Sequence, residues 1–332
     1  MKVLVTGGAG FIGSHLVDRL LAQGHEVYVL DDMSGGYSEN LPQEAKVIVI
    51  DLRNARRAKV CIEQIKPEII YHLAADAAEN KAQFSPIEVT SRNWNAFINV
   101  LTPAINNGLK RFIFTSSIAV YGHGPKWGKK PFHESDFCQP ADLYGITKLA
   151  CEESLKVLSK VHGFEYVIVR PHNVFGPRQN MRDPYRNVVT IFMNALLKGE
   201  AYNIYGDGEQ VRSFTYIDDL ADPLAKCAYL AAAKNHTYNM GTDTRLTINE
   251  LSKLIQEVAG KKIKPHYLPS RPQEVHEAVS NHSQADQVFG VYATPTKEAL
   301  KRTWEWVEAQ GPQDAKYQKL EINSPLIPEN WK

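Results

Sequence analysis

The sequence predicts an α/β protein with a doubly wound parallel sheet and a second, smaller unit of mixed α/β structure. Short apolar runs alternate with amphipathic helical patterns over about the first half of the chain, as repeated βα units do. The first apolar run ends in glycines that open a helix. After Pro171 the alternation loosens and loop residues become frequent, which is typical of a unit that binds ligands.

The strands and helices of the first half follow one another in regular order. Lys2–Thr6 is a short apolar run of the kind that forms a buried parallel strand. Phe11–Ala22 is predicted to be helical because Ile12, Leu16 and Leu20 share one helix face. Further strands are expected at Glu26–Leu30, Lys46–Ile50, Glu68–His72, Arg111–Thr115 and Tyr166–Arg170, and further helices at Asn54–Gln64, Ile87–Asn107 and Leu143–Val161.

Two glycines and a proline mark the ends and irregularities of these helices. Gly108 and Gly163 follow the two long helices and are expected to end them. Pro103 lies inside the predicted helix Ile87–Asn107. Because proline has no N–H to donate, we expect a kink at this position.

The second half has shorter and less regular elements. Thr247 is the expected N-cap of one helix, and Pro223 falls in the first turn of another, where proline is tolerated. Helices are expected at Asn187–Lys198, Asp219–Ala233 and Ile248–Ala259, and strands at Asn203–Asp207 and Arg212–Tyr216, on either side of a Gly-Asp-Gly turn.

Composition limits the kinds of partner that the chain can have. Of its 332 residues 43% are hydrophobic, and 38 basic residues face 37 acidic ones, which gives a net charge of +1. Such a chain is expected to fold, and it lacks the basic surplus of a nucleic-acid-binding protein. The length accommodates two joined units. We predict a first unit in residues 1–176, to which about 213–234 return, and a second unit in 177–212 and 235–332.

Cysteine usage and hydropathy favour a cytoplasmic protein. The four cysteines show neither a CxxC pair nor the spacing of metal ligands, so we expect reduced thiols and no metal site. No apolar run reaches the roughly 18 residues of a membrane-spanning helix. Glycines interrupt the apolar N-terminal stretch, which argues against a signal peptide.

Gly7, Gly10 and Gly13 follow the first strand and open the first helix. In that setting the glycine spacing predicts a dinucleotide-binding site on a Rossmann-type sheet. Glycine lets the backbone come close to a pyrophosphate, whose charge is stabilised by the helix N-terminus.

Acidic residues stand at the ends of the second and third strands. Asp31 lies 18 residues after Gly13, where a carboxylate accepts hydrogen bonds from an adenosine ribose and would repel a 2′-phosphate. Because no lysine or arginine follows in residues 32–36, we predict NAD rather than NADP as the cofactor. Asp51 is expected either to reach the adenine or to be the N-cap of the next helix.

Tyr144 and Lys148 are one helical turn apart, so their side chains share a helix face. An ammonium group beside a phenol is expected to lower the pKa of the phenol, which suits a general base near neutral pH. Ser116 and Ser117 end a strand of the same predicted sheet. A hydroxyl at that place could donate a hydrogen bond to a substrate oxygen.

These motifs resemble those of the extended short-chain dehydrogenase/reductases, and within them the nucleotide-sugar 4-epimerases, of which UDP-glucose 4-epimerase is the type. The matching segments of the first half are TGGAGFIGSHL from Thr6, the acid at Asp31, TSSIAVYG at 115–122 and YGITK at 144–148. The second half adds RPHNVFGPRQN at 170–180, Asn187-Val188, GDGEQVRSFTYIDDL at 206–220 and residues 271–274. The resemblance therefore covers nearly the whole chain. It implies that the first predicted unit, 1–176 with about 213–234, binds NAD, and that the second, 177–212 with 235–332, binds a nucleotide sugar.

The resemblance implies an enzyme with three catalytic residues. Tyr144 would be the base, Lys148 would hold the nicotinamide ribose and tune Tyr144, and Ser117 would bond the sugar 4-oxygen. The residues implied to bind NAD are Gly7, Gly10, Phe11, Ile12, Gly13, Asp31, Asp51, Leu52, Ala74, Tyr144 and Lys148.

The resemblance also assigns residues to a UDP-sugar. Asn173 matches a substrate-binding asparagine, although it could instead cap a turn. Glu274 stands where the family often has an aspartate that contacts the uridine ribose. The residues that match diphosphate-binding positions are Asn187, Val188, Arg212 and Arg271. Two arginines suit a dianionic diphosphate. Without a ligand, Arg212 could instead form a surface ion pair and Arg271 could be a solvated side chain.

By this resemblance the reaction is inversion at C4 of a UDP-sugar such as UDP-glucose or UDP-galactose. Tyr144 removes the proton of the 4-hydroxyl and hydride passes from C4 to the nicotinamide. The 4-keto sugar then turns, and hydride returns to its other face. The family usually dimerises through two long helices, here Ile87–Asn107 and Leu143–Val161, so a homodimer is expected.

Ala278 is implied to set the range of sugars. It lies four residues after Glu274, at a position that lines the pocket for the sugar 2-substituent in the family. A small side chain there admits an N-acetyl group. We therefore expect UDP-N-acetylglucosamine to be accepted beside UDP-glucose.

Other functions remain open. A 4,6-dehydratase carries Thr-Asp-Glu at the positions of Ser117–Ala119, and a UDP-glucuronate decarboxylase usually carries glutamate at Ala119, so this chain lacks their acid and base. An epimerase of a uronic acid could use Arg182 and Arg186 to meet a carboxylate. A non-catalytic NAD-binding sensor or scaffold is less favoured, because the serine, tyrosine and lysine are all present.

Overall fold

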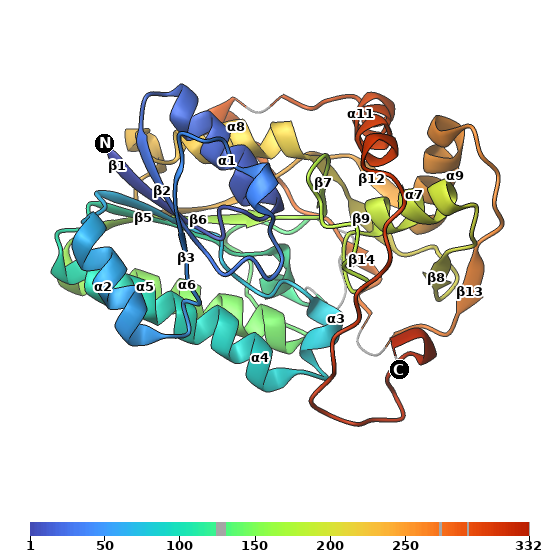
Figure 1. Cartoon of the computed structure of the whole chain (residues 1–332), viewed down its shortest axis with the longest axis horizontal. Helices are drawn as coiled ribbons and strands as arrows, with labels where there is room; N and C mark the ends of the chain where they lie inside the picture. The colour runs from blue at the N-terminus through green and yellow to red at the C-terminus, as the bar shows by residue number, and fades with distance from the viewer. Residues whose placement is uncertain (124–130, 272–273, 291, 332) are drawn as a thin grey trace.

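The centre of the computed structural model, which describes residues 1–123, 131–271, 274–290 and 292–331, is a parallel sheet of seven strands. The strand order is β3-β2-β1-β4-β5-β6-β11 (Figure 1). The order reverses between β1 and β4, and ligands bind at the carboxyl ends of the strands beside such a reversal. The strands are β1 (Lys2–Thr6), β2 (Glu26–Asp31), β3 (Lys46–Val49), β4 (Ile69–His72), β5 (Arg111–Thr115), β6 (Glu165–Pro171) and β11 (His236–Met240). The predicted doubly wound, Rossmann-type sheet is confirmed.

Helices cover both faces of the sheet. One face carries α1 (Phe11–Ala22) and α8 (Ile217–Lys226), and the other carries α2 (Ala55–Ile65), α5 (Ala96–Asn106) and α6 (Leu143–His162). Successive side chains of a strand point to opposite faces. Val3 and Val5 accordingly pack on the α1 side, and Leu4 packs on the α2 side. Burial on both faces explains why β1 is an unbroken apolar run.

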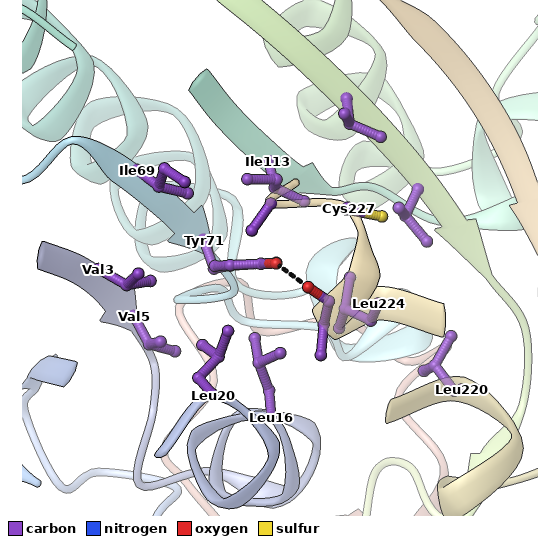
Figure 2. Packing of buried hydrophobic residues seen from close by; sticks show 14 of the residues in the cluster. Val3, Val5, Leu16, Leu20, Ile69, Tyr71, Ile113, Leu220, Leu224 and Cys227 are labelled. Atoms are coloured by element: carbon purple, nitrogen blue, oxygen red, sulfur yellow. Dashed lines mark hydrogen bonds between the residues drawn. The ribbon is translucent and has the colours of Figure 1, made fainter. Parts of the chain in front are cut away.

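Tyr71 links a distant segment to this core (Figure 2). It lies in β4, is fully buried, and its hydroxyl donates a hydrogen bond to the Ala225 carbonyl at 2.7 Å. Leu220 and Leu224 of α8 belong to the same apolar cluster. The helix that follows residue 216 therefore packs on the first sheet, far along the chain from the strands that it covers.

The predicted helix Ile87–Asn107 is not continuous. It is divided into α4 (Pro86–Thr90), a π-helical segment η2 (Ser91–Asn95) and α5. Pro103 lies inside α5 and does not end it. The π-helical turn carries Arg92 and Asn93, which bond to Asp32 and Asp76 in loops at the carboxyl edge of the sheet. Such turns occur often at functional sites, and contacts with distant loops explain why helical periodicity did not predict the break.

The remaining chain packs around three helices, α7 (Val188–Lys198), α9 (Ile248–Ala259) and α11 (Thr296–Gln310). Thr247 caps α9 as predicted, with Glu250 completing a capping box. Short strands complete this part of the fold. They are β7 (Val174–Phe175) with β10 (Thr215–Tyr216), β8 (Asn203–Tyr205) with β13 (His266–Leu268), and β9 (Val211–Ser213) between β12 (Arg245–Thr247) and β14 (Glu277–Ala278).

The chain beyond α8 departs from the prediction. The helix ends at Lys226 rather than Ala233, because the chain turns there and Asn235 N donates to the Tyr166 carbonyl at 2.7 Å, which starts the pairing of β11 with β6. The mixed sequence of β11 did not predict a strand. This strand extends the main sheet, although the predicted division of the chain into two units places residue 235 onward in the second unit. The division itself stays a prediction.

The C-terminal segment, residues 311–331, runs back across the molecule after α11 (Figure 1). Its backbone is held where Lys316 N donates to the Arg182 carbonyl at 2.8 Å. Near its end, Trp331 packs edge-on against Phe84 and Tyr185. The segment thus joins the loop before α7 to the loop before α4, and no sequence motif predicted this path.

Three further observations concern membrane spans, cysteines and metal ligands. In the ranges given above, no helix combines the length and the hydropathy needed to span a membrane. The four cysteines are free thiols, and Cys151 and Cys227 are buried. Those ranges also hold no group of three or more side chains suited to a metal ion.

Candidate active site

A cavity of about 980 Å³ runs along the carboxyl edge of the sheet and into the second half of the fold. Its wall includes the glycine turn after β1, Tyr144 and two arginines. The predicted site residues that line it are Gly7, Gly10, Phe11, Ile12, Gly13, Asp31, Asp51, Leu52, Ala74, Ser117, Tyr144, Lys148, Asn173, Asn187, Val188, Arg212, Arg271 and Glu274. Folding therefore brings residues from both halves of the sequence to a shared cavity.

The glycine turn packs backbone against backbone. A Cβ atom at Gly13 would lie 2.2 Å from the Gly7 carbonyl oxygen. Gly7 has φ +69°, and a Cβ there would lie 2.7 Å from the Ala74 nitrogen. Neither position accepts a side chain unless the turn moves. The close fit places the start of α1 directly above the ends of β1 and β4.

The N-terminus of α1 opens onto the cavity without a side-chain cap. Gly10 is the N-cap residue, and the first turn carries no acidic side chain. Gly10, Phe11 and Ile12 line the cavity, so free amide groups and the positive end of the helix dipole lie at its wall. Such a helix end is suited to hold a pyrophosphate.

Asp31 ends β2 and is buried at the cavity wall. Its carboxylate oxygens accept backbone hydrogen bonds from Ala9 N at 3.0 Å and Met33 N at 2.8 Å. Burial raises the pKa of this carboxyl, and the two amides oppose the rise. Each oxygen keeps a second lone pair, so Asp31 can still accept hydrogen bonds from ribose hydroxyls.

Asp51 is not the N-cap of α2, and that alternative is wrong. The side chain of Asn54 accepts a hydrogen bond from Arg57 N at 3.0 Å and caps the helix. Asp51 instead pairs with Arg53 at 2.6 Å, and the guanidinium holds the pKa of Asp51 below its usual range. A contact between Asp51 and an adenine stays a prediction.

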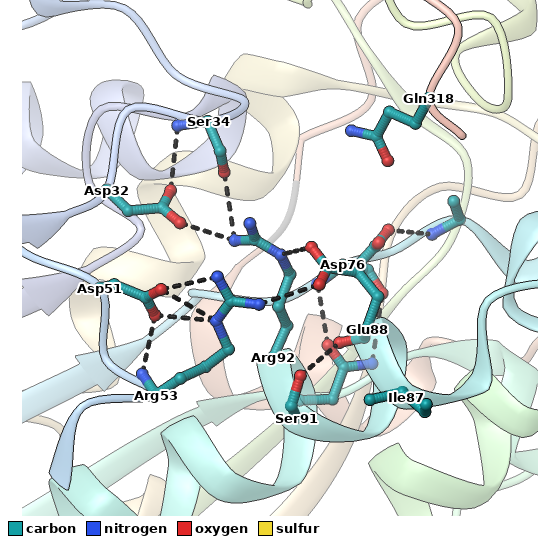
Figure 3. Close-up of polar contacts among 12 residues, drawn as sticks. Asp32, Ser34, Asp51, Arg53, Asp76, Ile87, Glu88, Ser91, Arg92 and Gln318 are labelled. Atoms are coloured by element: carbon teal, nitrogen blue, oxygen red, sulfur yellow. Dashed lines mark hydrogen bonds and ion pairs between the residues drawn. The ribbon is translucent and has the colours of Figure 1, made fainter. Parts of the chain in front are cut away.

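An ion-pair network that the sequence did not predict surrounds this end of the cavity (Figure 3). Arg92 of η2 pairs with Asp32 at 2.6 Å and also with Glu88. Glu88 in turn pairs with Arg53 at 2.8 Å. Both arginines are thus bound to carboxylates, so their charge is not free to attract a 2′-phosphate. Arg92 stands 60 residues from Asp32 in the sequence, and no local pattern could identify the pair.

Tyr144 and Lys148 are both buried on one face of α6. Lys148 Nζ donates a hydrogen bond to the Thr115 carbonyl at 2.7 Å and lies 5.8 Å from the centre of the Tyr144 ring. Ser117 precedes the short helix η3 (Ile118–Tyr121), and its Oγ accepts a hydrogen bond from Ala119 N at 3.1 Å. The Ser117 side chain is close enough to Tyr144 to oppose the rise of the Tyr144 pKa. The three predicted catalytic groups are therefore adjacent.

Burial governs the protonation of these groups. It raises the pKa of Tyr144, with the Glu79 carboxyl adding to the rise, and it lowers the pKa of Lys148 to about 8. The expected lowering of the phenol pKa is therefore not produced by the protein residues alone. A further positive charge beside the ring is needed to make Tyr144 a base near neutral pH.

Ser116 lines the cavity, but its hydroxyl is used in a buried contact. Its hydroxyl donates to Glu152, which pairs with Arg170 at 2.6 Å, and both charged side chains are buried. Ser117, and not Ser116, is the strand-end hydroxyl beside Tyr144.

Asn173 and Asn187 hold left-handed backbone at the cavity wall, with φ +38° and +68°. Non-glycine residues keep this conformation only where surrounding contacts impose it. The Asn173 amide donates to the Ser213 carbonyl at 2.8 Å, 40 residues along the chain, so its side chain does not cap a local turn. Asn187 precedes α7, and its side-chain oxygen accepts a hydrogen bond from Gln179 at 3.2 Å.

Glu274 joins the two arginines that were matched to a diphosphate. Its carboxylate pairs with Arg212 at 3.1 Å and with Arg271 at 2.8 Å. The Arg271 guanidinium also lies 4.6 Å from the centre of the Tyr205 ring. Burial lowers the pKa of Arg212. Both arginines are half-buried in the cavity wall, so neither is a freely solvated side chain.

Ala278 is absent from the described residues that line the cavity. It lies in β14, where it is paired with Arg212 of β9. Its methyl group packs against the apolar cluster of Ile118, Val120, Tyr121 and Phe132. A direct contact with a sugar substituent stays a prediction.

The cavity wall also contains charged groups outside the predicted NAD and UDP-sugar sites. Arg182 and Arg186 were predicted only for the alternative of a uronic acid, and the others were not predicted. Arg186 pairs with Asp183 at 2.5 Å, and Arg182 donates to the Gln313 side chain at 2.9 Å. Lys81 pairs with Asp76 at 2.5 Å and donates to the Gln318 side chain at 2.7 Å. Further lining residues come from α3 (Glu79–Ala82) and the C-terminal segment, among them Glu79, Tyr317 and Asn330.

Comparison with known proteins gives the same picture over most of the chain. The NAD dependent epimerase/dehydratase family matches residues 3–241. A UDP-glucose 4-epimerase of Mycolicibacterium smegmatis is 33% identical over 298 residues, which cover 87% of this chain and 93% of that protein. A UDP-N-acetyl-alpha-D-glucosaminuronate decarboxylase of Bacillus cytotoxicus is 31% identical over 280 residues, with 81% and 83% covered.

Two solved structures have the same fold. The UDP-glucose 4-epimerase of Thermotoga maritima with UDP-glucose has a TM-score of 0.87 and 34% identity, and the match covers 93% of this chain and 99% of that one. The UDP-glucuronic acid 4-epimerase of Bacillus cereus, in complex with UDP-glucuronic acid and NAD, has a TM-score of 0.85 and 26% identity, with 93% and 100% covered.

Proposed function

Because the chain belongs to the NAD dependent epimerase/dehydratase family, we propose that it inverts C4 of a UDP-sugar and interconverts UDP-glucose and UDP-galactose. The observation that carries this proposal is that Ser117, Tyr144 and Lys148 line one cavity together with the glycine turn and the two arginines. These three groups of residues match the parts of the ligands that must meet, namely a dinucleotide, a reacting hexose and a diphosphate.

NAD is the cofactor of this family, and the residues at the first end of the cavity fit it. The glycine turn leaves no space for a Cβ at Gly7 or Gly13, as a close backbone approach to a pyrophosphate requires. The uncapped start of α1 would hold the pyrophosphate, and Asp31 would accept the adenosine ribose hydroxyls.

Proton transfer is the part of the reaction that we assign to Tyr144. When bound, NAD supplies reversible hydride exchange with the sugar C4 and a positive charge beside the site. That charge offsets the effect of burial on the phenol, so Tyr144 would accept the proton of the 4-hydroxyl and later return it. Ser117, which already contacts Tyr144, would hold the 4-oxygen. Lys148, buried behind Tyr144, would bind the ribose.

The diphosphate is assigned to Arg212, Arg271 and the start of α7. A diphosphate would take the place of Glu274 as the anion between the two guanidinium groups, with bidentate hydrogen bonds. Asn187 and Val188 start α7, whose first turn has no acidic residue, so the helix dipole adds to the attraction. With the diphosphate held there, the hexose can turn and present either face to the nicotinamide.

The principal alternative is an epimerase of a uronic acid, which Arg182 and Arg186 in the cavity wall would favour. A decarboxylase or a 4,6-dehydratase needs an acid or a base beside Ser117, and the neighbouring Ile118 and Ala119 offer neither. A protein that binds NAD without catalysis does not require Ser117, Tyr144 and Lys148 to be adjacent, so their arrangement favours an enzyme.

The direct test is to incubate the purified protein with UDP-glucose, UDP-galactose, UDP-N-acetylglucosamine, UDP-glucuronate and dTDP-glucose, and to identify products by NMR. We expect UDP-glucose and UDP-galactose to interconvert, and the N-acetylated pair to do so as well. Loss of carbon dioxide, a stable 4-keto-6-deoxy product or no conversion of any neutral UDP-sugar would contradict the proposal.

We further infer that the protein forms a homodimer through α6. Ile146, Val157 and Val161 project from this helix with 51%, 61% and 69% of their surface exposed. Their spacing places them along one stripe of the helix, and burial of such a stripe against its symmetry copy would stabilise a dimer.

A further inference from the structure

Glu79 is a carboxylate of the cavity that the proposed mechanism does not use. It is the first residue of α3, in the loop region that follows β4 at the carboxyl edge of the sheet. Its side chain is exposed to the cavity. No hydrogen bond or ion pair joins it to another residue in the described ranges, whereas the neighbouring Asp76 is paired with Lys81.

The charged groups around Glu79 locate it between the two reactive ends of the substrate site. Glu79 lines the same cavity as Tyr144, Arg212 and Arg271. The segment that carries it packs against Tyr144, because Ala77 and Ala82 belong to one apolar cluster with the Tyr144 ring. The Glu79 carboxyl raises the pKa of Tyr144, and the charges of Arg212 and Arg271 act on Glu79. A hexose with its 4-oxygen at Tyr144 and its C1 diphosphate at the arginines must span the region where Glu79 lies.

Pairing of the nearby cations leaves the charge of Glu79 uncompensated. Lys81 has Asp76 as its partner, Arg186 has Asp183, and both Arg212 and Arg271 have Glu274. A diphosphate would occupy the two arginines in turn. Glu79 therefore offers the hexose a carboxylate without an ion-pair partner among the described residues, which can accept hydrogen bonds and repels a second anion.

We propose that Glu79 is a specificity-determining residue that binds the hexose of the sugar nucleotide and discriminates against a uronic acid. Its carboxylate accepts hydrogen bonds from hydroxyl groups of a neutral hexose, or from the N–H of an acetamido group. A C6 carboxylate in the same pocket meets a like charge. This inference rests on the proposed function, since it assumes that a UDP-hexose occupies the cavity.

The test is the ratio of the dissociation constants for UDP-glucuronate and UDP-glucose, measured by calorimetry on the NAD-loaded protein at about pH 8.5. Glu79→Gln keeps the shape of the side chain and removes its charge, so the ratio is expected to fall by about tenfold or more. Glu79→Asp retains the charge and is expected to keep most of the discrimination.

Glu200→Gln is the matched control. Glu200 lines the same cavity, but it lies beyond the C-terminal end of α7, at the end opposite Asn187. Removal of its charge is expected to change the affinities for the two nucleotides alike. A ratio that is unchanged in Glu79→Gln, or a wild-type protein that binds UDP-glucuronate as tightly as UDP-glucose, overturns the role of Glu79.

The dependence of this ratio on pH gives a second readout. Although the Glu79 side chain is open to the cavity, the surrounding protein excludes part of the solvent from its carboxyl. This desolvation, followed by the effect of Asp142, raises the pKa of Glu79 to about 7. Below that pH the carboxyl is neutral and no longer repels an anion. The groups that face it are Asp142 and Tyr144 of the α6 region, Arg212 of β9, and Arg271 and Glu274 before β14. Discrimination is expected to weaken from about pH 8.5 to about pH 6 in the wild type and to stay level in Glu79→Gln, and a parallel course in both proteins contradicts the proposal.

Epimerisation of UDP-glucose, measured on the same samples, separates the two hypotheses. A ratio that depends on Glu79 without any epimerisation contradicts the proposed function alone. Normal epimerisation with a ratio that is independent of Glu79 contradicts the specificity role alone.

Discussion

At the scale of single residues, the properties of Tyr144 come from its surroundings more than from Lys148. Burial raises the pKa of the phenol, and the hydrogen bond of Lys148 Nζ goes to the Thr115 carbonyl rather than to Tyr144. The sequence predicted the two residues and their shared helix face, but the pKa of the phenol depends on burial and on Glu79. Neither follows from the spacing of Tyr144 and Lys148.

We predict that Tyr144→Phe loses catalysis and keeps ligand binding. The ring fills the same space, but no group remains to accept the proton, so kcat should fall by about 10²- to 10⁴-fold. The dissociation constants for NAD and for UDP-glucose should change little. Steady-state kinetics and calorimetry measure these quantities, and a kcat near the wild-type value would show that another group is the base.

Gly13 offers a test of the cofactor site. In Gly13→Ala the new methyl group would lie 2.2 Å from the Gly7 carbonyl oxygen, so the turn must move, at a cost of about 1–3 kcal/mol. We expect the dissociation constant for NAD to rise about tenfold or more. Gly35→Ala is the control, because a Cβ there is 3.6 Å from Arg186 and has room. Equal NAD affinity in the two variants would contradict this account of the glycine turn.

At the scale of elements, the succession of strands and helices was easier to predict than the break within a helix. The first-half strands and most helices follow from apolar periodicity, because their faces are buried by neighbours close in the sequence. The break of the long helix into α4, η2 and α5 depends on contacts of Arg92 and Asn93 with distant loops. Likewise, β11 is a strand because β6 offers it an edge. Such tertiary causes leave no local signal.

The C-terminal segment supplies a cap for α4 from the far end of the chain. Ser85 makes no capping bond, and the Glu321 carboxylate instead accepts hydrogen bonds from Ile87 N at 2.8 Å and Glu88 N at 2.9 Å. We predict that Glu321→Ala lowers the free energy of unfolding by about 0.5–2 kcal/mol, as the loss of an N-cap does.

The same variant should raise KM for the sugar nucleotide, because Gln313 and residues 315–318 line the cavity and lose one of their attachments. Glu44→Ala is the control, since Glu44 is exposed in a loop outside the cavity wall. Urea unfolding and steady-state kinetics measure the two effects. An equal stability loss in both variants would mean that the bonds to α4 contribute nothing specific.

At the scale of the whole molecule, the site exists because two parts of the chain share one cavity. The glycine turn, the acid after β2 and the Tyr-Lys pair could be predicted, since each is a local motif placed at the carboxyl edge of the sheet. Glu79 and the C-terminal segment could not, because their importance comes from what lies opposite them in space. The resemblance to a family supplied the substrate residues Asn173, Asn187, Arg212 and Arg271, which no local pattern marks as a ligand site.

The exposed stripe of α6 predicts the oligomeric state. Val157→Glu places a charge among Ile146, Val157 and Val161 and should convert a dimer into monomers, as measured by analytical ultracentrifugation. Val60→Glu is the control, because Val60 is an exposed apolar residue of α2, 44% accessible and away from that stripe. A monomeric wild type, or dissociation by both variants, would be inconsistent with a dimer through α6.

The most direct measurement of the central claim is the reaction of UDP-galactose in D₂O with the NAD-loaded protein, followed by NMR and mass spectrometry of the sugar. If Tyr144 moves only the hydroxyl proton and the carbon-bound hydrogen stays within the site, UDP-glucose forms with no deuterium on carbon. Deuterium at C5 or C6, loss of C6, or the absence of UDP-glucose would contradict the proposed inversion at C4.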